Sequence, residues 1–145
     1  MIRRAAAVLV LGILQISPAR GDEKADLKKL EGTWLPSAAE FGGQKWSDEQ
    51  VKSFKLVIAD GKYIVTVSGQ DDKGTLKLNP DAKPPAMDIL GTEGPNKGHT
   101  FPAIYELSGD NLRICYALDG KERPAKFETT SGTRLFLVNY KRAKP

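Results

Sequence analysis

The carboxylates Glu106 and Asp110 are the residues whose types and spacing come closest to catalytic chemistry. Two neighbouring carboxylates can share the acid and base roles of a proton-transfer reaction. Glu106, however, alternates with Tyr105 and Leu107 in a strand pattern, whereas Asp110 follows Gly109 in a turn. Because different elements position the two side chains, the sequence does not predict a catalytic pair, and an enzyme is the function that it supports least.

The chain has one histidine, His99, and one cysteine, Cys115. These single residues exclude multi-histidine metal sites and zinc sites of the Cys₂His₂ type. His99 lies in a glycine-rich loop, which predicts a surface residue. Cys115 alternates within an extended apolar segment, so we interpret it as a buried small side chain; a reactive thiol and an intermolecular bridge are the alternatives. We therefore expect no metal and no other cofactor.

Two polar loops resemble ligand sites only superficially. Asp71 and Asp72 lie in the segment GQDDKG (69–74), but the regular oxygen spacing of a calcium loop is absent. We interpret both residues as the solvated tip of a hairpin. The segment GPNKG (94–98) lacks the spacing of a phosphate-binding loop, and no helical pattern follows it.

Arg113, Tyr116 and Arg123 are the candidate ligand-binding residues. A guanidinium group can bind a carboxylate or phosphate through two parallel hydrogen bonds. Arg113 alternates with apolar neighbours and is an ordinary outward side chain if they face inward; a partly polar interior would instead place it at a ligand. Arg123 precedes a proline, which holds it extended, so it either anchors a loop, through Glu122 or a strand-end carbonyl, or contacts a ligand.

These residues lie on a succession of short alternating segments joined by turn sequences. Eight or nine strands follow one another between residues 32 and 142, including a short strand around Phe127, and Asp60-Gly61 is a strong hairpin signal. Short helices are expected at 22–31 and 47–53, the second with Ser47 as N-cap. The pattern predicts an all-β fold, an antiparallel up-and-down β-barrel of about eight strands with a short N-terminal helix; a sandwich is the alternative.

The interior of this barrel decides its use, because small barrels are either filled by side chains or hold one small ligand. The candidate inward residues are bulky: Phe54, Leu56, Ile58, Tyr63, Leu112, Ile114, Tyr116, Leu135 and Leu137. We therefore carry two hypotheses. One is binding of a small apolar ligand inside the barrel, and the other is an interaction or structural module of the cell envelope with a solid core.

Gly32 and Trp34 begin the first strand and predict how the barrel closes. A tryptophan at this position can cover one end of a barrel and bury a large apolar area, and a nearby glycine allows the chain to bend. A basic side chain of the last strand can stack on the indole ring. Arg134 and Arg142 are the candidates, and Arg134 is the one that we assign with Gly32 and Trp34.

Residues 1–21 have the three parts of a secretory signal peptide: two arginines, an apolar segment and small residues before the expected cleavage site. An uncleaved anchor is the alternative. The segment 22–145 is then one exported domain, periplasmic or extracellular. Cleavage lowers the Lys+Arg count from 22 to 19 against 18 acidic residues. A net charge near +1 predicts neither nucleic-acid binding nor strong membrane binding.

Several segments occur in an order that is typical of one family: DLKKLEGTW (26–34), DGKY (60–63), GTLKLNP (74–80), EGPNKGHT (93–100), IYELSGDNLRICYA (104–117) and KERPAKFET (121–129). Together they resemble a family of small exported domains found mainly in planctomycete bacteria and described as lipocalin-like. Leu35 departs from the polar residue that usually follows the GTW triplet. The resemblance implies a barrel and supplies no catalytic or binding residues.

Overall fold

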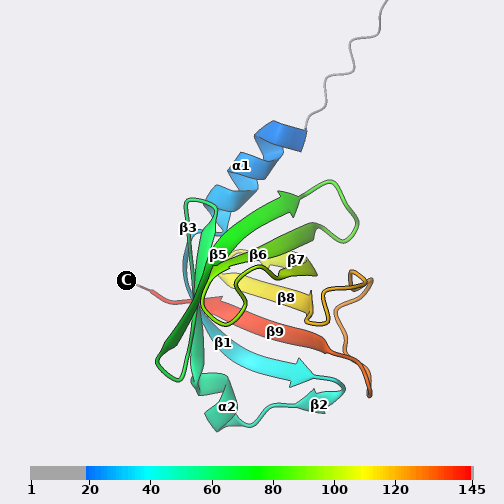
Figure 1. The fold of residues 1–145 in the computed structure, drawn as a ribbon. Helices are drawn as coiled ribbons and strands as arrows, with labels where there is room; N and C mark the ends of the chain where they lie inside the picture. The colour runs from blue at the N-terminus through cyan, green and yellow to red at the C-terminus, as the bar shows by residue number, and fades with distance from the viewer. Residues whose placement is uncertain (1–18, 145) are drawn as a thin grey trace, which may run out of the picture.

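The computed structural model describes residues 19–144, which form nine strands and two helices (Figure 1). The helices are α1 (Ala19–Lys29) and α2 (Asp48–Lys52). The strands are β1 (Gly32–Phe41), β2 (Gln44–Lys45), β3 (Phe54–Ala59), β4 (Lys62–Val67), β5 (Gln70–Asn79), β6 (Ala86–Glu93), β7 (Thr100–Ser108), β8 (Asn111–Ala117) and β9 (Leu135–Arg142).

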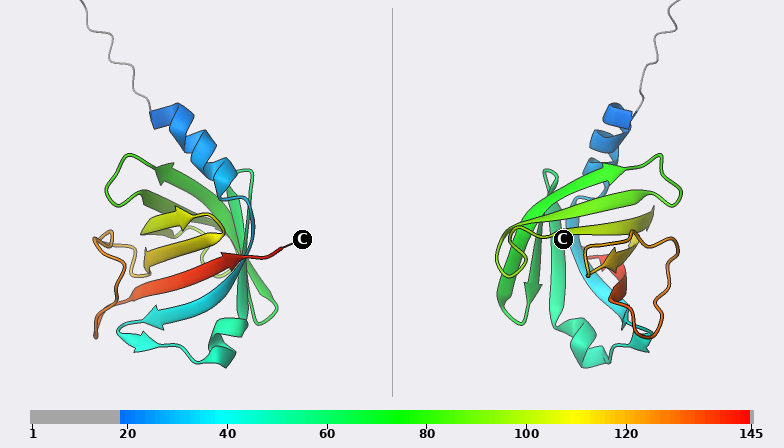
Figure 2. Two further views of the ribbon diagram at one scale, coloured as in Figure 1. Left: turned by 180° about the vertical axis from the view of Figure 1, so that it is seen from behind. Right: turned by 45° about the vertical axis from the view of Figure 1, so that its right-hand side comes forward.

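Eight of these strands close into an antiparallel barrel, which confirms the predicted all-β up-and-down fold. Each strand from β3 to β8 pairs with the next strand along the chain, and β1 pairs with both β3 and β9. The two-residue β2 pairs only with the end of β1 within the described chain. Figure 2 shows the closed wall from two further sides, with α1 outside it and leading into β1.

Local sequence signals explain how the strands turn and bend. Asp60 and Gly61 both have positive φ, of 52° and 71°, which is the backbone of a tight hairpin turn between β3 and β4. The β1–β9 register shifts between Pro36 and Ala38, so Ser37 is the extra residue of a bulge and the proline lies beside it, as expected for a residue without an N–H group. Ser47 caps α2 with the full capping box that the sequence predicts.

The barrel interior contains most of the predicted core. The buried inward residues include Phe54, Leu56, Ile58, Tyr63, Leu112 and Ile114. The prediction was wrong for β9, where Phe136, Val138 and Tyr140 face inward and Leu135 and Leu137 face outward. At the start of β9 the outward residues Leu135 and Leu137 are as apolar as the inward Phe136, so alternation does not distinguish the two sides there, whereas Asn139 and Lys141 mark the outward face further along the strand.

Trp34 lies at one end of the barrel, where β1 begins and β9 ends; we call this the closed end. Its side chain is fully buried and its indole N–H donates to the Leu30 carbonyl over 2.8 Å. The guanidinium of Arg142 lies 4.3 Å from the indole ring. The assignment of Arg134 was therefore wrong: Arg134 lies at the other end of β9, 5.9 Å from the Phe41 ring.

Helix α1 adds apolar cover at the closed end. Leu30, just after the helix, is fully buried, and Leu27 contacts the turn at Gly61. The signal-peptide prediction for residues 1–21 falls mostly on residues 1–18, which lie outside the described chain, and α1 begins at Ala19. Among residues 19–144 neither helix has the length and apolar character needed to cross a membrane.

Candidate ligand-binding cavity

A cavity of about 260 Å³ occupies the barrel interior beyond the side chains of the closed end. It reaches the surface at the opposite end, which we call the open end, because Val67 lines it there and is 46% exposed. Every strand from β3 to β9 contributes to its walls, and Trp46, Asn96 and Leu118 contribute from the connecting loops. The lining residues are Trp46, Phe54, Leu56, Ile58, Tyr63, Val65, Val67, Asp72, Leu76, Met87, Ile89, Asn96, Phe101, Ile114, Tyr116, Leu118, Phe136 and Tyr140.

An aromatic cluster forms one side of the cavity. The Trp46 ring lies 4.8 Å from Phe136 and 5.7 Å from Phe54, and Phe136 stacks at 5.9 Å on Tyr116. The Trp46–Phe54 pair is edge-to-face and the Tyr116–Phe136 pair is stacked, and aromatic pairs favour edge-to-face and offset stacked arrangements. The cluster gives the cavity a large and weakly polar surface.

The segment between β1 and β3 positions Trp46. The turn at Gly42 and Gly43 reverses the chain, β2 returns beside β1, and the Trp46 N–H donates to the Ala39 carbonyl over 2.9 Å. Immediately afterwards the Ser47 capping box starts α2. Because hydrogen bonds hold the backbone on both sides of Trp46, its indole stays against Phe54 at the side of the open end.

Asp72 is the charged residue of the cavity wall. It pairs with Val65 in the β4–β5 register, and Val65 faces inward, so Asp72 also faces inward. The prediction of a solvated hairpin tip was wrong for Asp72, because the β4–β5 turn lies earlier, at Ser68 and Gly69. Asp71, its neighbour, faces outward and accepts a 2.7 Å hydrogen bond from Thr66.

The loop after β6 places Asn96 beside Asp72. The Asn96 amide group donates to one carboxylate oxygen over 2.8 Å, and its backbone N–H donates to the other over 3.4 Å. The loop is held by hydrogen bonds of Gly91 with the carbonyl of His99 and the N–H of Gly98, both 2.9 Å. The GPNKG segment is therefore a compact turn that presents an amide to the cavity.

Three tyrosines add hydroxyl groups to the wall. The Tyr116 and Tyr140 hydroxyls lie 2.8 Å apart and share a hydrogen bond. The Tyr63 hydroxyl is buried and has no hydrogen-bond partner among the described residues. Burial, with a smaller contribution from the negative charge of Asp72, raises the pKa of Tyr63 to about 12. Burial also raises the pKa values of Tyr116 and Tyr140.

Of the three predicted ligand-binding residues, only Tyr116 lines this cavity. Arg113 lies on the outer face of the barrel, where its guanidinium stacks 4.0 Å from the Phe127 ring and pairs with Glu106 at 3.2 Å. Its outward direction follows from its alternation with Leu112 and Ile114, which are buried in the interior. Arg113 therefore occupies the ordinary outward position that the sequence offered as one alternative.

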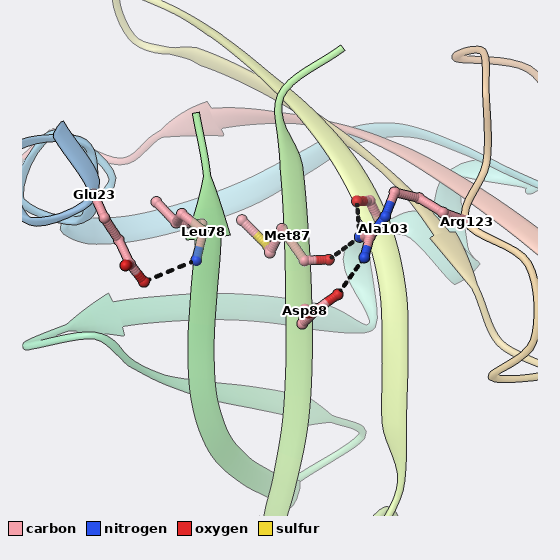
Figure 3. A network of polar contacts seen from close by, with 6 residues as sticks. All are labelled: Glu23, Leu78, Met87, Asp88, Ala103 and Arg123. Atoms are coloured by element: carbon pink, nitrogen blue, oxygen red, sulfur yellow. Dashed lines mark hydrogen bonds and ion pairs between the residues drawn. The ribbon is translucent and has the colours of Figure 1, made fainter. Parts of the chain in front are cut away.

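Arg123 holds the long segment between β8 and β9 against the barrel (Figure 3). Its guanidinium donates to the carbonyls of Met87 and Ala103, at 3.1 and 2.9 Å, and pairs with the Asp88 carboxylate at 2.6 Å. Arg123 therefore anchors the loop, which is one of the two alternatives that the sequence offers, and it does so through strand carbonyls and not through Glu122. Residues 118–134, all of them described, form no strand, so the short strand predicted around Phe127 was wrong.

The remaining polar candidates stay outside the cavity. Glu106 pairs with Arg113 and Asp110 pairs with Arg142, so the two carboxylates do not face each other. His99 is exposed and stacks on Phe101. Cys115 is fully buried, and burial raises the pKa of its thiol to about 11. Within residues 19–144, no group of three or more metal-ligating side chains is close enough to hold a metal ion.

Sequence reasoning missed Trp46, Asp72 and Asn96. For Asp72 the available signal was the dipeptide Ser68-Gly69, which can form a two-residue hairpin turn. Both of its residues have positive φ, as Asp60 and Gly61 do. Comparison with protein-family models, curated proteins and solved structures gave no match. The functional argument therefore rests on the geometry of the cavity.

Proposed function

We propose that the barrel binds one small, largely apolar molecule in its interior. The observation that supports this most strongly is the cavity of about 260 Å³ with aromatic and aliphatic walls. Small-molecule sites are typically concave and mostly apolar, with a few polar groups. An apolar cavity of ~150 Å³ is large enough for benzene, so this one corresponds by proportion to a ligand of roughly ten non-hydrogen atoms.

The cavity counts against the alternative, a cell-envelope module with a solid core. Phe54, Ile114 and Tyr116 are as bulky as the sequence suggests, yet they line the wall of the space without filling it. A barrel whose only role is to present its outer surface gains stability when its interior is filled, because an empty cavity costs dispersion contacts.

We further propose that the protein is exported by residues 1–21 and belongs to the lipocalin-like family that its sequence resembles. The motifs between residues 26 and 129 support the family, and the arginines and apolar segment at the N-terminus support export. An exported barrel with an apolar cavity is suited to taking up a small molecule outside the cytoplasm.

Tryptophan fluorescence during titration with 1-octanol tests the binding proposal. Trp46 lines the cavity, whereas Trp34 is fully buried at the closed end, so octanol binding should change mainly the Trp46 emission. We expect a saturable change in the natural protein. In Val65→Phe the larger ring enters the cavity, and we expect affinity to fall at least about tenfold.

Ile64→Phe is the matched control, because Ile64 directly precedes Val65 in β4 and faces outward. It adds the same ring to the same strand and should leave octanol binding unchanged. A non-saturable change, or equal binding by Val65→Phe and the natural protein, would argue that octanol does not occupy the barrel.

A further inference from the structure

The charges on the cavity wall are one-sided. Among the described residues that line it, Asp72 is the one that carries a formal charge at neutral pH, and no lysine, arginine or histidine is present. The two arginines among the candidate ligand-binding residues, Arg113 and Arg123, pair with acidic residues outside the cavity. Lys97, beside Asn96 in the loop, is exposed and does not line the cavity.

The Asp72 carboxylate retains capacity to accept hydrogen bonds. An ionised carboxylate offers about four acceptor positions. Asn96 occupies two of them, through its side-chain amide and its backbone N–H. The same contacts fix the orientation of the carboxylate at the open end. A hydrogen-bond donor that enters the cavity therefore finds a negative group already held in place.

The negative field of Asp72 extends into the barrel. Its charge contributes to the raised pKa of the Tyr63 hydroxyl, which is buried in the interior without a partner among residues 19–144. The surrounding wall is also rich in aromatic rings, including Trp46, Phe54 and Phe101. Aromatic faces attract cations, most strongly when both groups are removed from water.

These observations have opposite consequences for ligands of opposite charge. A carboxylate would be brought into a largely apolar space beside another carboxylate, where like charges repel more strongly than in bulk water. An ammonium group at the same place would donate to Asp72 in a charge-assisted hydrogen bond while the attached hydrocarbon fills the aromatic cavity.

We propose that the cavity selects small apolar amines, with the ammonium group at Asp72 and the hydrocarbon part among the aromatic side chains. The proposal rests on the proposed ligand-binding function and specifies the chemical class of the ligand. It adds a charge preference to the small apolar ligand that the sequence predicts.

Three probes of one chain length test the proposal by isothermal titration calorimetry: n-octylamine, 1-octanol and octanoate at neutral pH. We expect the amine to bind most tightly, the alcohol next and the carboxylate at least about tenfold more weakly than the amine. In Asp72→Asn the preference for the amine over the alcohol should disappear, and octanoate should bind more tightly than it does to the natural protein.

Asp71→Asn is the matched control, because it changes net charge equally on the outer face of the same strand. It should keep the natural order of affinities, and circular dichroism checks that both variants are folded. If octanol binds and octanoate binds as tightly as octylamine, the amine proposal is wrong, but the ligand-binding function stands. If none of the three probes binds, the ligand-binding function itself is wrong, and the amine proposal with it. The probe series on the natural protein decides even if Asp72→Asn does not fold.

Discussion

Arg142 connects the last strand of the barrel to the beginning of the first. Its guanidinium stacks on Trp34, donates to the carbonyls of Glu31 and Lys29, and pairs with Asp110. A planar guanidinium can make all these contacts at once, whereas a lysine ammonium has its three donors on one nitrogen and no planar face to stack on the indole. This single side chain therefore fixes the position of the chain between α1 and β1.

We predict that Arg142→Lys lowers the free energy of unfolding by about 1–3 kcal/mol, because carbonyls and the indole lose their partner. Urea unfolding measures the change. Arg134→Lys is the control: Arg134 is exposed and lies far from Trp34 along β9, so its effect should stay within about 0.5 kcal/mol. Equal effects of the two substitutions would contradict the role given to Arg142.

The raised pKa of Tyr63 predicts an alkaline loss of stability. Its folded-state value of about 12 lies above the ordinary value of 10.0. The neutral phenol therefore stabilises the folded protein fully below pH 10, and this contribution is lost as the pH rises from 10 towards 12. Urea unfolding over this range should show a fall in stability that is smaller in Tyr63→Phe. An identical fall in both proteins would mean that Tyr63 does not titrate as described.

At the scale of the element, β5 shows how one glycine determines a strand pairing. A Cβ atom on Gly74 would lie 1.9 Å from the Leu90 carbonyl oxygen and 2.6 Å from the Tyr63 ring. The β5–β6 register shifts between Lys73 and Gly74, so the neighbouring backbone approaches closely here. Only a residue without a side chain fits between Tyr63 and β6.

We predict that Gly74→Ala destabilises the protein by about 3 kcal/mol, because the Leu90 carbonyl belongs to the backbone and cannot rotate away. Thr75 directly follows Gly74 and faces outward, so Thr75→Ala should lower the stability much less. Thermal unfolding of both variants makes the comparison. A Gly74→Ala protein as stable as Thr75→Ala would show that β5 and β6 can separate without penalty.

Alternation predicted the elements well where the two faces of a strand differ in polarity. In β3 the buried Phe54, Leu56 and Ile58 alternate with Lys55, Val57 and Ala59, and the inward side is clear. In β9 the first residues are apolar on both faces, with Leu135 and Leu137 outside and Phe136 inside, so the inward side was misassigned. Arg142 was recoverable in principle, because antiparallel pairing places the end of β9 opposite the beginning of β1.

The site was harder to predict than the fold because it depends on contacts between distant segments. Asp72 and Asn96 meet only when the β4–β5 turn and the loop after β6 are both placed correctly. Arg123 looked suited to an anionic ligand, yet the carbonyls that it binds belong to β6 and β7. Residue types indicated which side chains were available, and the register decided which of them meet.

At the scale of the whole molecule, a hollow barrel should be stabilised by its ligand. A molecule that binds only the folded state adds about 2.7 kcal/mol of stability when its concentration is one hundred times Kd. We predict that n-octylamine raises the thermal unfolding midpoint of the natural protein and of Ile64→Phe in a saturable way. The midpoint of Val65→Phe should rise clearly less at the same octylamine concentration, because the added ring occupies part of the cavity; equal shifts in all three proteins would indicate an effect unrelated to the barrel.

A crystal structure of the protein grown with n-octylamine tests the central claim most directly. The account predicts electron density for the alkyl chain inside the barrel, between Phe54 and Met87, with the nitrogen within hydrogen-bond distance of Asp72. An interior filled by side chains, or octylamine bound only on the outer face, would contradict it.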